Sequence, residues 1–154
     1  LLLRNYVIIN ANVPTGSMMN TIMENDNLFG LRLAYKFSDP KRGDIVIFYY
    51  PDNPKEQYIK RIIGEPGDKV VIKNAKIYIN DSEEPLEEKY LPEEWTNNND
   101  GYEFEVPADS YLMLGDNRNN SSDSRFDGVG KVKRDTIIGR AWIRIYPFDE
   151  IKKL

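Results

Sequence analysis

Residues 42–63 read RGDIVIFYYPDNPKEQYIKRII, and this segment gives the strongest indication of the fold class. β-Branched and aromatic residues fill positions 45–50 and Pro51 ends the run, which is typical of a strand. Residues 57–63 form a second run of the same kind. Arg-Gly-Asp at 42–44 leads directly into the first run, which favours a turn over an integrin-binding motif. The stretch therefore indicates strands rather than helices.

The sequence on both sides repeats this strand character. Further strands are predicted at 30–37, 69–73, 76–80, 102–107, 110–116 and 137–147. Asn74-Ala75 predicts a hairpin turn, and Pro66-Gly67 fits the centre of a type II turn. Because almost no segment has a 3.6-residue apolar period, we predict a mainly β protein with long loops and little helix.

The length of 154 residues suits one domain. Residues 81–101 are acidic and polar, and they predict a loop with one short helix from Pro85 to Tyr90. We therefore expect a single domain over 1–154 with a small excursion or lobe at about 75–107. The apolar start, LLLRNYVIINANV, contains Arg4 and is too short to cross a bilayer. It fits either a first strand or the trailing edge of a membrane anchor.

Composition excludes several kinds of site. The net charge is −4 and there is no basic stripe, which argues against a nucleic-acid surface. Cysteine is absent, so disulfides and Cys-ligated metals are excluded. Histidine is also absent, which excludes a Ser-His-Asp triad and His-ligated metals. A nucleophilic enzyme of this composition must use Lys, Asp, Glu or a free α-amine as its base.

Two residues are candidates for that chemistry. In VPTGSMMNTI (13–22), Pro14 and Gly16 turn the backbone just before Ser17, so its hydroxyl can project from an apolar surface. Lys60 lies mid-strand in apolar company, and burial would lower the pKa of its amine. A shift to about 8 costs roughly 3 kcal/mol. The plainer alternatives are a simple turn before core methionines and a lysine that reaches solvent.

GDNRNNSSDSRFDG (115–128) follows a predicted strand and is dense in turn formers. A calcium loop does not fit, since Arg118 and Arg125 occupy positions where oxygen ligands are needed. The stretch is either an Asx-rich loop or a set of side chains that orients a catalytic group.

Four segments in order resemble the sequence boxes of bacterial type I signal peptidases, which are serine proteases with a Ser-Lys dyad. These segments are VPTGSMMNTI, RGDIVIF, YIKRIIGEPGDKV and GDNRNNSSDSR, and the resemblance spans residues 11 to about 140. The short connection between the last two is similar to the compact Gram-positive enzymes. The resemblance implies an antiparallel β fold shared with SOS-repressor proteases. It also implies a membrane-associated endopeptidase that cuts signal peptides after Ala-x-Ala through an acyl-enzyme.

The resemblance implies roles for named residues. Ser17 would be the nucleophile and Lys60 the general base, with the oxyanion bound by the Ser17 N–H and the Thr15 hydroxyl. Ser121 matches the hydroxyl that hydrogen-bonds the lysine. Supporting charged residues in the last segment are Asp116, Arg118, Asp123 and Arg125.

The substrate would bind as an added strand, with its small residues in two pockets. The pocket next to the cut would be formed by Val13, Pro14, Met18, Ile22, Tyr58 and Ile59, and the other by Ala11, Leu28 and Ile59. Asn20 departs from the family, which usually has Pro there.

The implied partners are signal peptides of secretory preproteins and the membrane lipid surface, with no nucleic acid, metal or cofactor. The resemblance also implies an anchor before residue 1 and a catalytic domain on the extracytoplasmic face of the cell membrane. It leaves the oligomeric state open.

Two other functions compete with this interpretation. A self-cleaving Ser-Lys protease of the SOS-repressor type would need a scissile bond such as Ala-Gly before its serine, and residues 1–16 contain no Ala-Gly pair. A non-enzymatic β binding module would use Ser17 and Lys60 only structurally.

Overall fold

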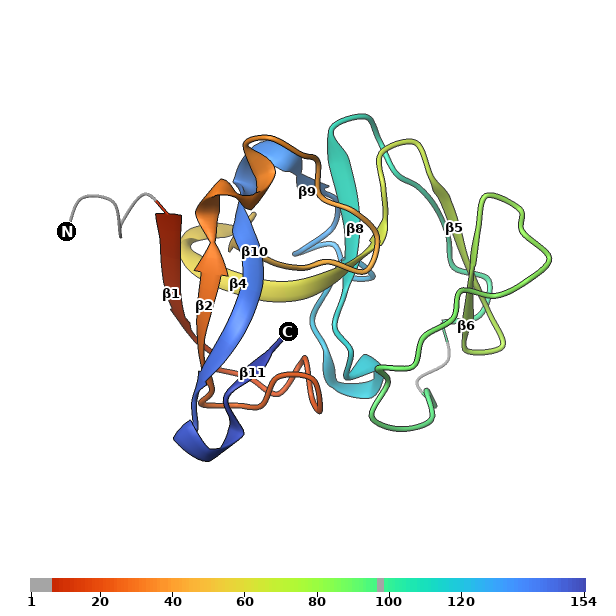
Figure 1. Cartoon of the computed structure of the whole chain (residues 1–154). Coiled ribbons are helices and arrows are strands. Elements are labelled where there is room, and N and C mark those ends of the chain that lie inside the picture. Colours follow the sequence, from red (N-terminus) through yellow and green to blue (C-terminus); the bar gives the residue numbers. More distant parts are fainter. Residues whose placement is uncertain (1–6, 97–98) are drawn as a thin grey trace.

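Two antiparallel sheets make up the architecture (Figure 1). The computed structural model describes residues 7–96 and 99–154. The larger sheet runs in the order β1-β2-β10-β3-β4-β8-β9, and β11 pairs with β10 at its side. Its strands are β1 (Ile8–Asn12), β2 (Asn27–Leu31), β3 (Ile45–Tyr50), β4 (Asn53–Gly64), β8 (Ser110–Leu114), β9 (Val132–Lys133), β10 (Ile137–Tyr146) and β11 (Lys152–Lys153). The predicted mainly β, antiparallel fold is confirmed.

The smaller sheet has three strands in the order β6-β5-β7. They are β5 (Lys69–Lys73), β6 (Lys76–Ile79) and β7 (Glu103–Glu105). Asn74 and Ala75 both have positive φ, at 51° and 55°, as a two-residue hairpin turn requires. Gly67 has φ of 86°, which fits the predicted type II turn before β5. The hairpin and turn predictions are confirmed.

Short 3-10 turns connect several strands. They are η1 (Arg32–Tyr35), η2 (Arg118–Asn120), η3 (Arg134–Thr136) and η4 (Phe148–Glu150). Within residues 7–96 and 99–154, no helix has both the length and the apolar character needed to span a bilayer.

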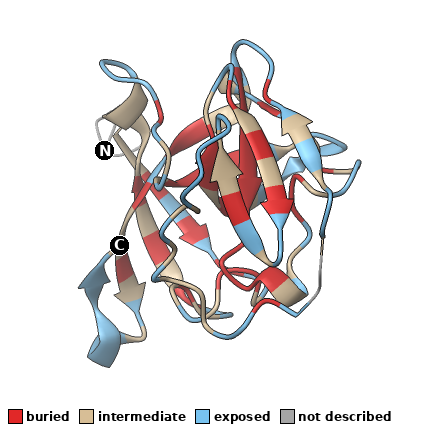
Figure 2. Cartoon of the chain, turned by 90° about the vertical axis from the view of Figure 1, so that its right-hand side faces the viewer, coloured by how far each residue is buried: buried red, intermediate tan, exposed pale blue. Residues whose placement is uncertain are grey.

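Buried residues lie along the strands of the larger sheet, and the end of the chain at 151–153 is exposed (Figure 2). β3 supplies four successive buried residues, Ile45–Phe48, because it lies inside the larger sheet between β10 and β4. A separate apolar cluster fills the smaller sheet, where Trp95 from the 81–101 segment packs with residues such as Ile72 and Ile77. Burial of these side chains is the main favourable contribution to folding.

β4 is twelve residues long, and only its second half is buried. β3 pairs with it along nearly its whole length, whereas β8 pairs only with Arg61, Ile62 and Gly64. The first half of β4 therefore has a free edge on the β8 side, within the described residues. A free edge can accept another strand.

Two sequence predictions of local structure were wrong. The strand predicted at 30–37 ends at Leu31. The residues that follow, Arg32–Tyr35, form the 3-10 turn η1 although their apolar residues alternate as in a strand. The helix predicted from Pro85 to Tyr90 does not form. The Leu86 N–H bonds the carbonyl of Ile77 in β6, which draws this segment alongside the smaller sheet in extended form. Residues 1–6 lie outside the described part of the chain, so the structure does not describe that part of the predicted first strand. The first described strand, β1, begins at Ile8.

A buried ion pair joins the β1–β2 connection to β10. Arg144 Nη1 lies 3.0 Å from Asp26 Oδ2, with the two side chains 5% and 2% exposed. Asp26 Oδ2 also accepts a hydrogen bond from the Met23 N–H, at 2.8 Å. Removal of Asp26 would leave Arg144 paired with Glu150, whose side chain is 55% exposed. Breaking a buried pair of this kind typically costs about 3–5 kcal/mol.

We therefore expect Asp26→Asn to lower the free energy of unfolding by about 3 kcal/mol in urea titrations. The control is Lys89→Gln, which breaks the pair of Lys89 with Glu87 on the surface, where the two side chains are 86% and 76% exposed. That variant should stay close to the wild type, because water screens exposed pairs. Equal stabilities for Asp26→Asn and the wild type would contradict the importance of the buried pair.

Candidate active site

The connection between β1 and β2, residues 13–26, forms a closed loop that carries Ser17. Val13 and Asp26 close its base, since the Val13 N–H bonds the Asp26 carbonyl at 2.9 Å. Inside the loop, the Met19 N–H bonds the Gly16 carbonyl at 3.1 Å, which makes a tight turn. Met18 is 1% exposed and anchors the turn in the core, so Ser17 lies directly above the apolar interior.

β4 brings Lys60 to this serine. Lys60 Nζ lies 2.8 Å from Ser17 Oγ, and both residues are buried, at 3% and 8% exposure. The Lys60 amine also donates to the Ile59 carbonyl at 3.1 Å and lies 5.0 Å from the centre of the Tyr58 ring. The side chain therefore points into the protein and does not reach for solvent.

Burial lowers the pKa of Lys60 from 10.5 to about 8, because the interior disfavours the charged ammonium. The negative charges of Asp123 and Asp116 act in the opposite direction but are weaker than the effect of burial. A useful fraction of the amine is then neutral near neutral pH, and a neutral amine next to a hydroxyl can accept its proton.

Two hydroxyls lie near the serine. Thr15 Oγ1 donates to Ser17 Oγ at 3.3 Å from the exposed side of the loop. Ser121 does not make the expected hydrogen bond to Lys60. Its Oγ is buried and has no hydrogen-bond partner within the described part of the chain. It lies instead against Gly115, where an added Cβ would come 2.1 Å from it.

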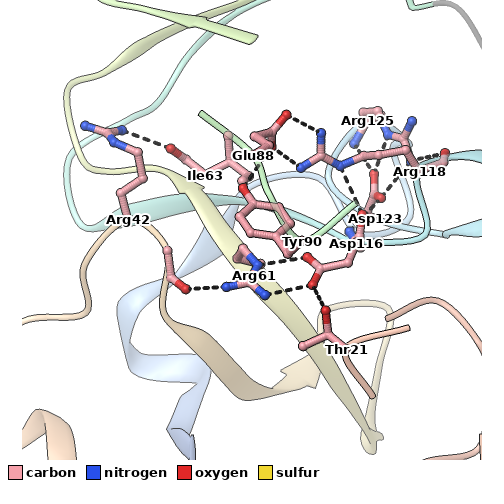
Figure 3. Close-up of polar contacts among 12 residues, drawn as sticks. Thr21, Arg42, Arg61, Ile63, Glu88, Tyr90, Asp116, Arg118, Asp123 and Arg125 are labelled. Carbon is pink, nitrogen blue, oxygen red and sulfur yellow. Dashed lines mark hydrogen bonds and ion pairs between the residues drawn. The ribbon is translucent and has the colours of Figure 1, made fainter. Parts of the chain in front are cut away.

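The charged residues of the 115–128 segment form three separate pairs (Figure 3). Asp123 and Arg125 pair with each other at 2.8 Å and are 0% and 1% exposed. Asp116 pairs with Arg61 through two hydrogen bonds of 2.8 and 2.7 Å. Arg118 pairs with a residue from a distant segment, Glu88, and that pair is also buried.

Sequence reasoning missed several of these partners. The Tyr90 hydroxyl donates to Glu88 Oε1 at 2.9 Å, and Arg61 Cζ lies 3.8 Å from the centre of the Tyr90 ring. Trp95 lies 5.1 Å from Arg118 Cζ. No local signal marks Glu88 among the many acidic residues of 81–94, whereas Tyr90 and Trp95 were visible as isolated aromatics in a polar stretch.

A cavity of about 950 Å³ opens beside Ser17 and Lys60. Of the predicted pocket residues, those that line it are Val13, Pro14, Met18, Tyr58 and Ile59. Polar residues that sequence reasoning missed also line it: Asn12, Gln57, Asn117, Asn120 and Ser122. The other three predicted pocket residues, Ala11, Ile22 and Leu28, do not line this cavity. Those three belong to the core behind it, where Ala11 of β1 pairs with Leu28 of β2.

Comparison with known proteins places this chain among peptidases. The family model described as signal peptidase, peptidase S26 matches residues 1–146. The chain is 40% identical to a signal peptidase I of Leptolyngbya laminosa, over 99% of this chain and 75% of that protein. It is 37% identical to a signal peptidase I of Bacillus amyloliquefaciens, over 99% of this chain and 83% of that protein. Among solved structures, a signal peptidase I from Enterococcus faecalis V583 matches with a TM-score of 0.55 and 32% identity, over 67% of this chain and 97% of that one.

The burial of Lys60 predicts a pH-dependent cost in stability. Lysine in an unfolded chain titrates near pH 10.4, so between about pH 8 and 10.4 the unfolded state binds more protons and stability rises with pH. Below pH 8 both states carry the ammonium, and its burial costs the folded state about 3 kcal/mol. We expect Lys60→Met to be more stable than the wild type at pH 6, with an advantage that disappears by about pH 10.5.

Urea unfolding at pH 6, 7, 8, 9 and 10 measures this difference. Lys73→Met is the matched control, because Lys73 is exposed at the end of β5 and should give no such pH-dependent gain. A Lys60→Met protein that is less stable than the wild type at pH 6 would refute the predicted cost.

Proposed function

The chain belongs to the signal peptidase I family, peptidase S26, and is by homology a serine endopeptidase; we propose that it cuts signal peptides from secretory preproteins after an Ala-x-Ala-like motif. The observation that carries this proposal is the 2.8 Å contact between Lys60 Nζ and Ser17 Oγ at the floor of the cavity. The family assignment favours this function over a self-cleaving repressor-type protease and over a non-enzymatic module.

In the proposed mechanism, Ser17 is the nucleophile and Lys60 the general base. The neutral amine of Lys60 takes the Ser17 proton as Oγ attacks the scissile carbonyl. The ammonium that forms then gives its proton to the leaving amine of the mature protein. Ser17 is left as an acyl-enzyme, and a water molecule, deprotonated by the same amine, hydrolyses the ester and releases the signal peptide. Asp123 and Asp116 stabilise the transient ammonium by their charge.

The oxyanion would be bound by the Ser17 N–H and the Thr15 hydroxyl. Thr15 Oγ1 already lies on the cavity side of Ser17 Oγ, at 3.3 Å. Loss of one such donor typically costs about 3 kcal/mol of transition-state stabilisation. Ser121 would orient the Lys60 amine only after a change of its side-chain rotamer, since its Oγ does not contact Lys60 here. Asp123 with Arg125, and Asp116 and Arg118, would support the site from beneath.

The free edge of β4 suits an extended substrate. Gln57, Tyr58 and Ile59 lie in the part of β4 that β8 leaves unpaired, and all three line the cavity. A signal peptide could add as a strand here through main-chain hydrogen bonds. Its small residue before the cut would lie against Val13 and Met18, which line the cavity and pack into the core behind it.

Membership of the family also supports a location. Signal peptidase I enzymes are typically membrane-associated, and we propose that this chain works on the extracytoplasmic face of the cell membrane, next to the lipid surface. We also propose that residues 1–154 act as one catalytic domain, with the lobe at about 75–107 as an appendage that contains the hairpin turn and β6 and β7.

Cleavage of a preprotein in detergent tests the dyad. The wild type should release the signal peptide, whereas Ser17→Ala and Lys60→Ala should each reduce kcat by at least about a thousandfold. Ser38→Ala and Lys73→Ala, both at exposed positions, are the matched controls and should cleave at the wild-type rate. Undiminished cleavage by Lys60→Ala would exclude the amine as base.

The lowered pKa of Lys60 predicts the pH dependence of the reaction. The base must be neutral, so kcat/KM should fall about tenfold per pH unit below pH 8 and level off above it. The measurement is the initial rate on a peptide substrate from pH 5 to 10, with circular dichroism as the control for folding. A rate that stays constant down to pH 5 would contradict a lysine base.

A further inference from the structure

We propose that Asn117 is a positioning residue that aims the Ser17 N–H at the substrate oxyanion. The inference rests on the proposed function, because it concerns the same nucleophile. Asn117 follows β8 at the start of the η2 turn, is 9% exposed and lines the cavity beside Ser17.

Asn117 holds the backbone on both sides of the nucleophile. Its side-chain amide, through Nδ2, donates to the Gly16 carbonyl at 2.9 Å. Its own backbone N–H donates to the Ser17 carbonyl at 3.0 Å. One residue therefore fixes the two successive carbonyl groups that flank the Ser17 backbone N–H and side chain.

The first of these bonds determines where the Ser17 N–H points. The Gly16–Ser17 peptide bond is trans, and in a planar trans peptide the carbonyl and the following N–H point in opposite directions. With the Gly16 oxygen held by Asn117 and by the Met19 N–H, the Ser17 N–H faces away from both. No hydrogen bond in the described part of the chain uses this N–H, so it is available to a developing oxyanion.

The residues on both sides of Asn117 are held by buried charged groups, and Figure 3 shows the contacts of these neighbours, Asp116 and Arg118. The preceding residue, Asp116, is bound twice by Arg61. The following residue, Arg118, donates from Nε to the Gly115 carbonyl at 3.0 Å and pairs with Glu88. The turn is therefore fixed before the Asn117 amide reaches across to Gly16.

Gly115 permits the close approach of the two turns. A Cβ at this position would come 2.5 Å from the Ser17 carbonyl oxygen, which no side chain could tolerate. The Gly115 N–H is bound by Asp123 Oδ2 at 3.0 Å. Glycine thus brings the supporting turn close enough for both Asn117 hydrogen bonds to form.

Loss of the Asn117 amide would leave the Gly16 carbonyl held by the Met19 N–H, so the Gly16–Ser17 peptide could tilt and misdirect the oxyanion donor. Such an error affects the transition state more than the bound substrate, because the oxyanion forms only during the reaction. A displacement of a reacting group by about 1 Å can cost a hundredfold in rate. The expected signature is therefore a lower kcat with an unchanged KM.

The experiment measures kcat and KM of the full chain on a fluorogenic peptide with an Ala-x-Ala site, in detergent. Asn117→Leu removes the donor at nearly the same side-chain volume, and kcat should fall by about ten- to a hundredfold while KM stays within about twofold. The pH midpoint of kcat should stay that of the wild type, since Lys60 keeps its surroundings. Asn10→Leu, at an exposed position of β1, is the matched control and should keep the wild-type kcat.

A folded Asn117→Leu protein with wild-type kcat, or with a loss confined to KM, would overturn the proposal; its thermal unfolding midpoint shows whether it is folded. If that variant does not fold, Asn117→Asp decides. Aspartate keeps the shape of asparagine but places a carboxylate oxygen opposite the Gly16 carbonyl. The kcat of this variant on the high-pH plateau should therefore fall by at least tenfold relative to the wild type. A wild-type kcat on that plateau would refute the proposal. Failure of the wild type to cleave, or cleavage by Ser17→Ala, refutes the proposed function instead.

Discussion

A lysine amine is held out of water against a serine hydroxyl, and the rest of the site depends on that contact. Burial favours the neutral amine, but two carboxylates, Asp116 and Asp123, lie close enough to favour the charged form. Burial is the larger effect, so the pKa of Lys60 falls to about 8. Each carboxylate is also paired with an arginine, Asp116 with Arg61 and Asp123 with Arg125.

The contact also requires three parts of the chain to meet. Ser17 comes from the loop between β1 and β2, Lys60 from the middle of β4, and the supporting turn from the residues that follow β8. The sheet order sets β4 next to β8, and it puts β1 at one end of the same sheet. The 81–101 segment completes the arrangement, since Glu88 and Tyr90 bind the arginines of the supporting turn and of β4.

Much of the fold could be predicted from local patterns, and most of the site could not. Strands were found where β-branched and aromatic residues alternate or run together, because that pattern fits a pleated surface. The Pro85–Tyr90 segment was predicted as a helix, and long-range contacts of Glu88 and Tyr90 overrode that local preference. The family resemblance placed Leu28 in a substrate pocket, whereas in the structure it is fully buried in the core.

The residue types alone require that any base here be an amine or a carboxylate, since histidine is absent, and the apolar patterns predict mainly antiparallel strands. The ordered segments of the sequence also pointed to the family. The burial of Lys60 beside Ser17 and the pairing of Asp116 with Arg61 rather than Arg118 emerge from the folded arrangement. Residue type fixes which protonation states and hydrogen bonds are possible. The pKa of a group and the choice of its partner depend instead on solvent exclusion and distance, which arise only when remote segments pack together.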